Sequence, residues 1–143
     1  MAKADLAQEV AASRLIALAT SASQPILQGE WLRPGTHINA VGSFRPDLRE
    51  FDRATVERAE LWVDLREAAE EEAGELIEAA KAGVLQWSRC RELGELLDEP
   101  SSAPTQSNSD RITLFKSVGH AAQDLYAALA ISRLRNANDS AGP

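Results

Sequence analysis

Three short apolar segments in the first half of the chain constrain the fold more than any other feature. They comprise residues 15–20 (LIALAT), 36–41 (THINAV) and 61–65 (LWVDL). Segments of this length are typical of strands, and the continuous run at 15–20 indicates a strand buried on both faces. Strands that alternate with helices pair in parallel through right-handed crossovers. We therefore expect an α/β fold with about three parallel strands and flanking helices.

Periodicity and capping residues indicate the helices between these strands. Residues 4–12 and 67–81 repeat apolar side chains at helical spacing, and Asp52 can cap a helix that runs through Ala59. In the 67–81 helix we expect one apolar stripe toward the core and the glutamates, including Glu75, on the solvent side. The stripe consists of Ala69, Ala73, Leu76 and Ala80.

The second half of the chain is less regular. The expected elements are helical turns over 84–97, a loop over 100–109, an extended piece over 112–115, and a helix capped by Ser117 that ends near residue 134. The expected core leucines of this half are Leu93, Leu96 and Leu97. We expect a single domain over residues 1–135 and a flexible tail over residues 136–143.

The composition argues against several classes of function. The formal net charge is −7 and the pI about 4.8, so the surface repels nucleic acid and acidic membranes. Cys90 is the only cysteine, which excludes an internal disulfide and suits the cytoplasm. Because His37 and His120 are the only histidines, neither a metal site nor a nucleophile triad is supported. No signal peptide is indicated in residues 1–20.

Polar or glycine-containing segments follow three of the expected extended elements. In open α/β sheets, ligands bind in the crevice beyond the carboxyl ends of the strands. Each segment alone is typical of a turn or a helix cap, and their joint occurrence is what makes them candidates. The candidate binding residues are Thr20, Ser21, Val41, Gly42, Ser43, Lys116, Ser117, Val118 and Gly119. Neither GxGxxG nor GxxxxGK[ST] occurs, so the sequence holds neither phosphate-binding loop.

Several longer stretches resemble the ornithine cyclodeaminase/mu-crystallin family over roughly residues 5–135. The most specific are GTHINAVGS at 35–43 and ITLFKSVG at 112–119; RPD at 45–47, EFD at 50–52, VD at 63–64, AGEL at 73–76, ELGELL at 92–97 and QDL at 123–125 accompany them. The resemblance implies two-domain NAD(P)-dependent proteins, of which this chain corresponds to the C-terminal half. The second half of a Rossmann-like domain would be present, and the glycine-rich turn would lie before Met1.

The resemblance also implies roles for the candidate residues. Thr20 and Ser21 would line the cofactor, residues 41–43 would face the nicotinamide, and residues 116–119 would close that end of the site. Cyclodeaminases carry a proton-transferring aspartate where this chain has Phe44, which cannot move a proton. Arg14 also departs from the family, which usually has an acidic residue there. We therefore expect no catalytic residue in this chain.

Three functions remain open from the sequence. The favoured one is a truncated structural or binding remnant that is inactive alone and binds no cofactor tightly. The second is an NAD(P)-dependent amino-acid or imine oxidoreductase, or a cyclodeaminase-like subunit, whose cofactor site is completed by another chain. The third is a small-molecule binding protein. We expect a homodimer, or a separate chain that carries the missing half, as the partner, since an unpaired sheet edge needs covering.

Overall fold

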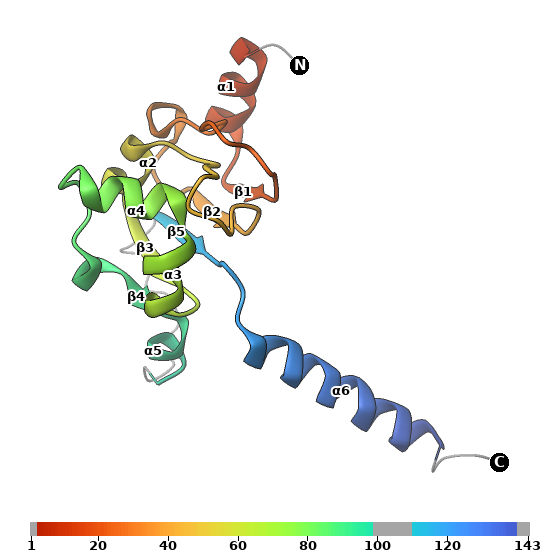
Figure 1. The fold of residues 1–143 in the computed structure, drawn as a ribbon. Helices are drawn as coiled ribbons and strands as arrows, with labels where there is room; N and C mark the ends of the chain where they lie inside the picture. Colours follow the sequence, from red (N-terminus) through yellow and green to blue (C-terminus); the bar gives the residue numbers. More distant parts are fainter. Residues whose placement is uncertain (1–2, 99–109, 140–143) are drawn as a thin grey trace.

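The computed structural model describes residues 3–98 and 110–139, and centres on a parallel five-stranded sheet (Figure 1). The strand order is β1-β2-β5-β3-β4. The strands are β1 (Leu15–Leu18), β2 (His37–Ala40), β3 (Ala59–Val63), β4 (Arg91–Glu92) and β5 (Ile112–Lys116). The expected parallel α/β class is confirmed, but three strands is too few. The extended piece at 112–115 becomes β5 and inserts between β2 and β3, and the two-residue β4 has no apolar pattern to reveal it.

Helices and short 3₁₀ turns connect the strands. They are α1 (Lys3–Ala12), η1 (Gly29–Trp31), α2 (Arg53–Arg58), α3 (Arg66–Glu72), α4 (Gly74–Lys81), η2 (Trp87–Arg89), α5 (Leu93–Asp98) and α6 (Ala121–Asp139). The predicted cap of α2 is confirmed, because the Asp52 carboxylate accepts a hydrogen bond from the Thr55 amide at 2.9 Å. Asp52 also accepts from the Gly29 amide, which ties α2 to η1.

The predicted single helix over 67–81 is wrong, because the chain breaks at Ala73 into α3 and α4. Ala73 leaves helical geometry with φ −79° and ψ 89°. Gly74 then packs against the loop before α2: a Cβ there would lie 2.4 Å from the Leu48 carbonyl oxygen. This turn brings Glu75 into the interior at 2% exposure, so its predicted place on the solvent side is also wrong. Glu70, Glu71 and Glu72 are exposed, as expected.

The core lies on one face of the sheet, which α2, α3 and α4 cover (Figure 1). One row across the strands, formed by Ile38, Leu114 and Leu61, is almost fully buried. The opposite face is more polar and half-buried; there the His37 Nδ1 lies 2.7 Å from the Thr113 hydroxyl.

The strand β1 forms one edge of the sheet, and only one of its faces is covered. Leu18 is buried, whereas Leu15 is 67% exposed on the other face. The prediction that this strand is buried on both faces is therefore wrong for the described structure. The reason is that no helix of the described chain packs over Leu15 and Ala17.

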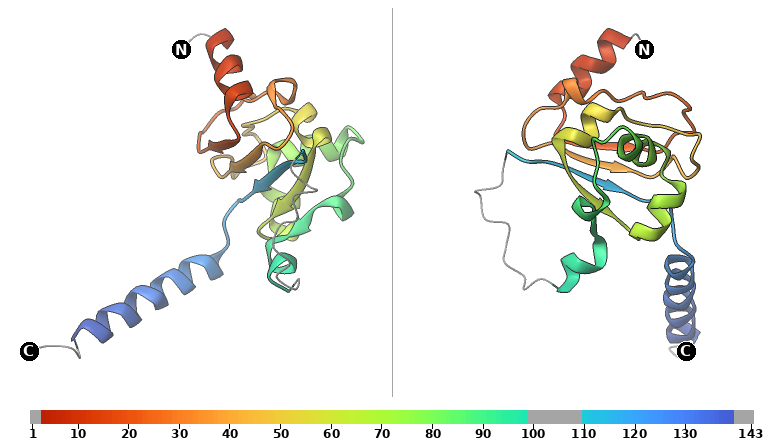
Figure 2. Two further views of the ribbon diagram at one scale, coloured as in Figure 1. Left: turned by 180° about the vertical axis from the view of Figure 1, so that it is seen from behind. Right: turned by 60° about the vertical axis from the view of Figure 1, so that its left-hand side comes forward.

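The helix α6 extends away from the sheet in every view (Figures 1 and 2). It begins at Ala121, so Ser117 does not cap it, and it continues to Asp139 into the segment expected to be a tail. From residue 121 to 136 its side chains are exposed, except for the half-buried Ala122. Leu93 was expected in the core but is 39% exposed, because α5 also leaves the body of the fold. The side chains of Leu96 and Leu97, and the predicted loop, lie outside the described residues.

Candidate functional site

The candidate binding residues lie together at the carboxyl ends of three neighbouring strands. The strands β1, β2 and β5 are neighbours and parallel, so the loops that follow them lie side by side at the carboxyl ends of the strands. Backbone hydrogen bonds continue the ladder into these loops: the Val41 amide donates to Leu18, and the Ser117 amide donates to Ala40. We call the three loops, residues 20–21, 41–43 and 116–119, the rim. Sequence segments almost a hundred residues apart thus form one surface.

A buried glutamate joins the first two loops of the rim. Glu50 is 0% exposed, and its Oε1 accepts from the Thr20 amide at 2.6 Å and the Thr20 hydroxyl at 3.0 Å. Its Oε2 accepts from the amides of Gly42 and Ser43 at 2.8 and 3.1 Å. The loops approach so closely that a Cβ at Gly42 would lie 2.1 Å from the Thr20 amide nitrogen. Only glycine fits at this position.

A second carboxylate holds the third loop. Asp64 follows β3, and its Oδ2 accepts from the Ser117 hydroxyl at 2.7 Å and from the amides of Val118 and Gly119 at 3.2 and 2.9 Å. Gly119 adopts a φ of 87°, which a residue with a side chain rarely adopts. Asp64 therefore fixes the shape of the loop that precedes α6.

A buried polar cluster lies beneath the rim. The Ser43 hydroxyl lies 2.7 Å from Glu75 Oε2, and the Lys116 ammonium donates to the Ser43 carbonyl. Burial raises the pKa of the Glu75 carboxyl, and the nearby Lys116 opposes that shift. Burial lowers the pKa of Lys116, while Glu75, Glu50 and Asp64 oppose the change. The side chains of Ser43 and Lys116 therefore support the rim from below rather than reaching its surface.

The rim suits a group without negative charge better than a phosphate. The carboxylates of Glu50 and Asp64 already accept from five rim amides: those of Thr20, Gly42, Ser43, Val118 and Gly119. An anion would find these amides occupied and would meet two carboxylates behind them. Apolar surface is available beside them, since Val41 is 49% and Phe44 is 54% exposed. Within the described residues, no cluster of acidic, histidine or cysteine side chains could hold a metal.

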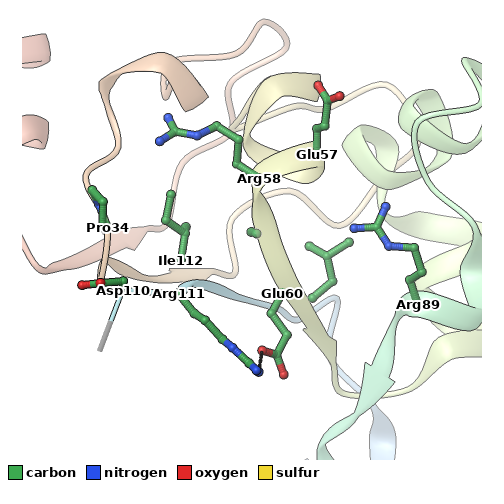
Figure 3. Close-up of a pocket in the computed structure, with 10 residues that line it drawn as sticks. Pro34, Glu57, Arg58, Glu60, Arg89, Asp110, Arg111 and Ile112 are labelled. Atoms are coloured by element: carbon green, nitrogen blue, oxygen red, sulfur yellow. Dashed lines mark hydrogen bonds and ion pairs between the residues drawn. The ribbon is translucent and has the colours of Figure 1, made fainter. Parts of the chain in front are cut away.

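A hollow of about 630 Å³ lies at the other end of the strands, near the start of β3 and β5 (Figure 3). Its arginines are already engaged. Arg111 forms an ion pair with Glu60 at 3.0 Å, and Arg58 donates to the carbonyl of Leu32 at 3.0 Å. This hollow lies at the amino ends of β3 and β5, whereas the rim lies at the carboxyl ends of the strands.

Comparison with known proteins matches the Ornithine cyclodeaminase/mu-crystallin family over residues 1–138. The chain belongs to this family. Ketimine reductase mu-crystallin of Mus musculus is 41% identical over 121 residues, which cover 85% of this chain and 36% of the mouse protein. Delta(1)-pyrroline-2-carboxylate reductase of Paracoccus denitrificans (strain Pd 1222) is 39% identical over 135 residues, covering 93% of this chain and 42% of that protein. The chain thus spans less than half the length of these family members.

A solved structure of the family has the same fold. The structure of Thermococcus litoralis Delta(1)-pyrroline-2-carboxylate reductase, in complex with NADH and L-proline, matches with a TM-score of 0.71 and 38% identity. The match covers 79% of this chain and 35% of that one. The Rossmann-like α/β assignment is therefore secure. None of the helices in the described part of the chain is long and apolar enough to cross a membrane.

The carboxylates that hold and support the rim loops were not predicted from the sequence. Glu50, Asp64 and Glu75 belong to stretches that resemble the family, but nothing in their spacing indicates which loops they hold. Asp64 could have been found by the rule that selected the other candidates, because it directly follows a strand. Glu50 gives no such signal, since its partners lie 30 and 8 residues away along the chain.

Proposed function

We propose that this chain supplies the nicotinamide side of an NAD(P)(H) site in a reductase of cyclic imines, and that it is inactive alone. The observation that carries the proposal is the rim, whose amides donate to the Glu50 and Asp64 carboxylates and which exposes the apolar side chain of Val41 next to that of Phe44. Such a surface fits a ring without negative charge and leaves the phosphates to another part of the site. When bound, the nicotinamide of the cofactor supplies or accepts a hydride.

The relatives favour imine reduction over cyclodeamination. Those named above are a ketimine reductase and two pyrroline-2-carboxylate reductases. Phe44 stands where the cyclodeaminases carry an acid, and its exposed ring offers no proton. In this chain, Val41 and Phe44 would contact the bound ring and exclude water from it, while Glu50 and Asp64 would hold the backbone that lies against it.

The rest of the site would come from the part of the relatives that this chain does not match. A homodimer or a separate chain could also cover β1 and α6, whose Leu15, Leu125 and Leu134 are 58% to 67% exposed. We place this assembly in the cytoplasm. Cys90 is a free thiol buried inside the protein, and burial raises its pKa to about 11, so this thiol resists oxidation.

Amide chemical shifts test the proposal. In an NMR titration with nicotinamide mononucleotide at millimolar concentration, we expect the amides of Val41, Gly42 and Gly119 to shift. Adenosine monophosphate is the matched control, because it carries the same ribose phosphate without the nicotinamide. Equal shifts with both nucleotides, or shifts only around Ala59 and Ile112 in the opposite hollow, would contradict the proposal.

A further inference from the structure

The carboxylates of Glu50 and Asp64, which hold the rim loops, use their oxygens differently. Within the part of the chain that the structure describes, Oε1 of Glu50 accepts only from Thr20, and Oε2 accepts only from Gly42 and Ser43. Asp64 serves its loop with Oδ2 alone, while Oδ1 accepts from the adjacent Leu65 amide at 3.0 Å. Glu50 therefore connects two loops that follow different strands, whereas Asp64 holds a single loop.

The position of Glu50 leaves it little freedom to do anything else. Its side chain is fully buried, and its backbone carbonyl also accepts from the amides of Ile26 and Leu27 at 3.0 Å. The residue is thus fixed at both ends, and the distance between its two carboxylate oxygens sets the separation of the loops. Gly42 allows this separation to be short, since any side chain there would meet both Thr20 and Glu50.

From this geometry we infer that Glu50 is a positioning residue, which sets the spacing of the two rim loops through one carboxylate oxygen for each loop. The inference deepens the proposed function and rests on it for its relevance to the cofactor. A ring seated between Thr20 and Val41 would then be accepted or rejected by a spacing that Glu50 determines without touching the ring. Removing one oxygen releases one loop and leaves the other in place.

The test compares Glu50→Gln with Asp64→Asn in the full chain, using amide hydrogen exchange followed by NMR. Glutamine keeps one acceptor oxygen and turns an NH₂ group toward the amides of the other loop, so one loop must let go. We expect either the Thr20 amide or the Gly42 and Ser43 amides to exchange at least about tenfold faster, with the other loop unchanged. In Asp64→Asn the remaining oxygen can still serve Val118 and Gly119, so their exchange should change by less than about threefold.

A second measurement separates positioning from general support of the fold. Glu50→Gln should weaken the binding of nicotinamide mononucleotide by about fivefold or more, while Glu60→Gln, in the opposite hollow, should leave it nearly unchanged. Unaltered exchange in Glu50→Gln would overturn the inference, and so would faster exchange that spreads to Ile38 and Leu114 in the centre of the sheet. Equal effects of Glu50→Gln and Asp64→Asn on amide exchange would also overturn it. Exchange is measured without nucleotide, so a failure of the proposed function leaves this result interpretable.

Discussion

The ammonium nitrogen of Lys116 lies 3.8 Å from Oε1 of Glu75, and the two side chains are 0% and 1% exposed. Among the described residues Glu75 Oε1 has no hydrogen-bond partner, and its distance from Lys116 is too long for a hydrogen bond. The two charges therefore compensate each other across the core without direct contact. Such a pair is costly to bury, and each group is the main neutralising charge of the other.

A double-mutant cycle on this pair should show strong coupling. Glu75→Gln leaves the buried ammonium ion without its opposite charge, and Lys116→Met does the same to the buried carboxylate, so the effects of the two changes on the free energy of unfolding should be non-additive by about 1 kcal/mol or more. The double variant removes both charges and should lose less than the sum of the two. Urea denaturation followed by circular dichroism measures all four proteins. Additive losses would show that the pair does not interact.

The stability of the protein should also depend on pH through Glu75. Burial raises the pKa of this carboxyl in the folded chain above its usual 4.5, so the folded state binds the proton more tightly than the unfolded state. The stabilisation from this group is complete below pH 4.5 and is lost as the pH rises through the raised pKa. The free energy of unfolding of the parent minus that of Glu75→Gln should therefore fall as the pH rises through that interval. A difference independent of pH would contradict this prediction.

The course of the chain up to β3 could be predicted because local patterns decide it. Short apolar runs predicted β1, β2 and β3, and Asp52 marked the start of α2. The helix break at Ala73 could not be predicted, because it depends on the contact of Gly74 with the Leu48 carbonyl, which is a contact between distant segments. The burial of Glu75 follows from that break. An acidic residue in a helical pattern is expected to be solvated unless tertiary structure supplies partners.

The isolated chain should bind NAD(H) and NADP(H) weakly, with a dissociation constant on the order of millimolar or higher. The sequence contains no GxGxxG loop, and the rim amides are occupied by Glu50 and Asp64, so the pyrophosphate finds no cradle here. Isothermal titration calorimetry with NADH measures this. Micromolar affinity would indicate a phosphate site elsewhere in the chain and would favour an enzyme that is complete in itself.

Ornithine should not be deaminated by this chain. Phe44 cannot transfer a proton, and Phe44→Asp should not restore activity, because the phosphate-binding part of the cofactor site would still be absent. The measurement is ammonia release from ornithine in the presence of NAD, with heat-denatured protein as the control. Release by the parent chain above that control would contradict the proposal, and release only by the variant would show that Phe44 alone prevents the reaction.

The candidate site was only partly accessible to sequence reasoning. Strand-end segments identified the loops of the rim, since parallel strands place their carboxyl ends together. The sequence did not show that the Ser43 and Lys116 side chains point into the core, because strand alternation alone does not say which face is covered. It also did not show the role of Glu50, whose four contacts come from two loops on different strands.

The chain should form a stable homodimer through β1, α6 or both. The helix α6 carries apolar side chains around most of its circumference, and a helix of that kind is normally enclosed. Leu125, Tyr126 and Ile131 are 58%, 71% and 67% exposed. The edge strand β1 presents Leu15 beside its unpaired edge, which is a surface that proteins usually cover. Sedimentation equilibrium at micromolar concentration should therefore give the mass of two chains.

Substitutions on the two faces of β1 separate assembly from folding. Leu15→Lys places a charge on the exposed face, so the protein should stay folded, and the dimer should weaken if β1 lies in the interface. Leu18→Lys places a charge in the core at a position only 7% exposed and should destabilise the fold by about 3 kcal/mol or more. Leu125→Lys makes the same test on α6. A monomer mass for the parent chain, or a dimer that survives Leu15→Lys combined with Leu125→Lys, would contradict assembly through these surfaces.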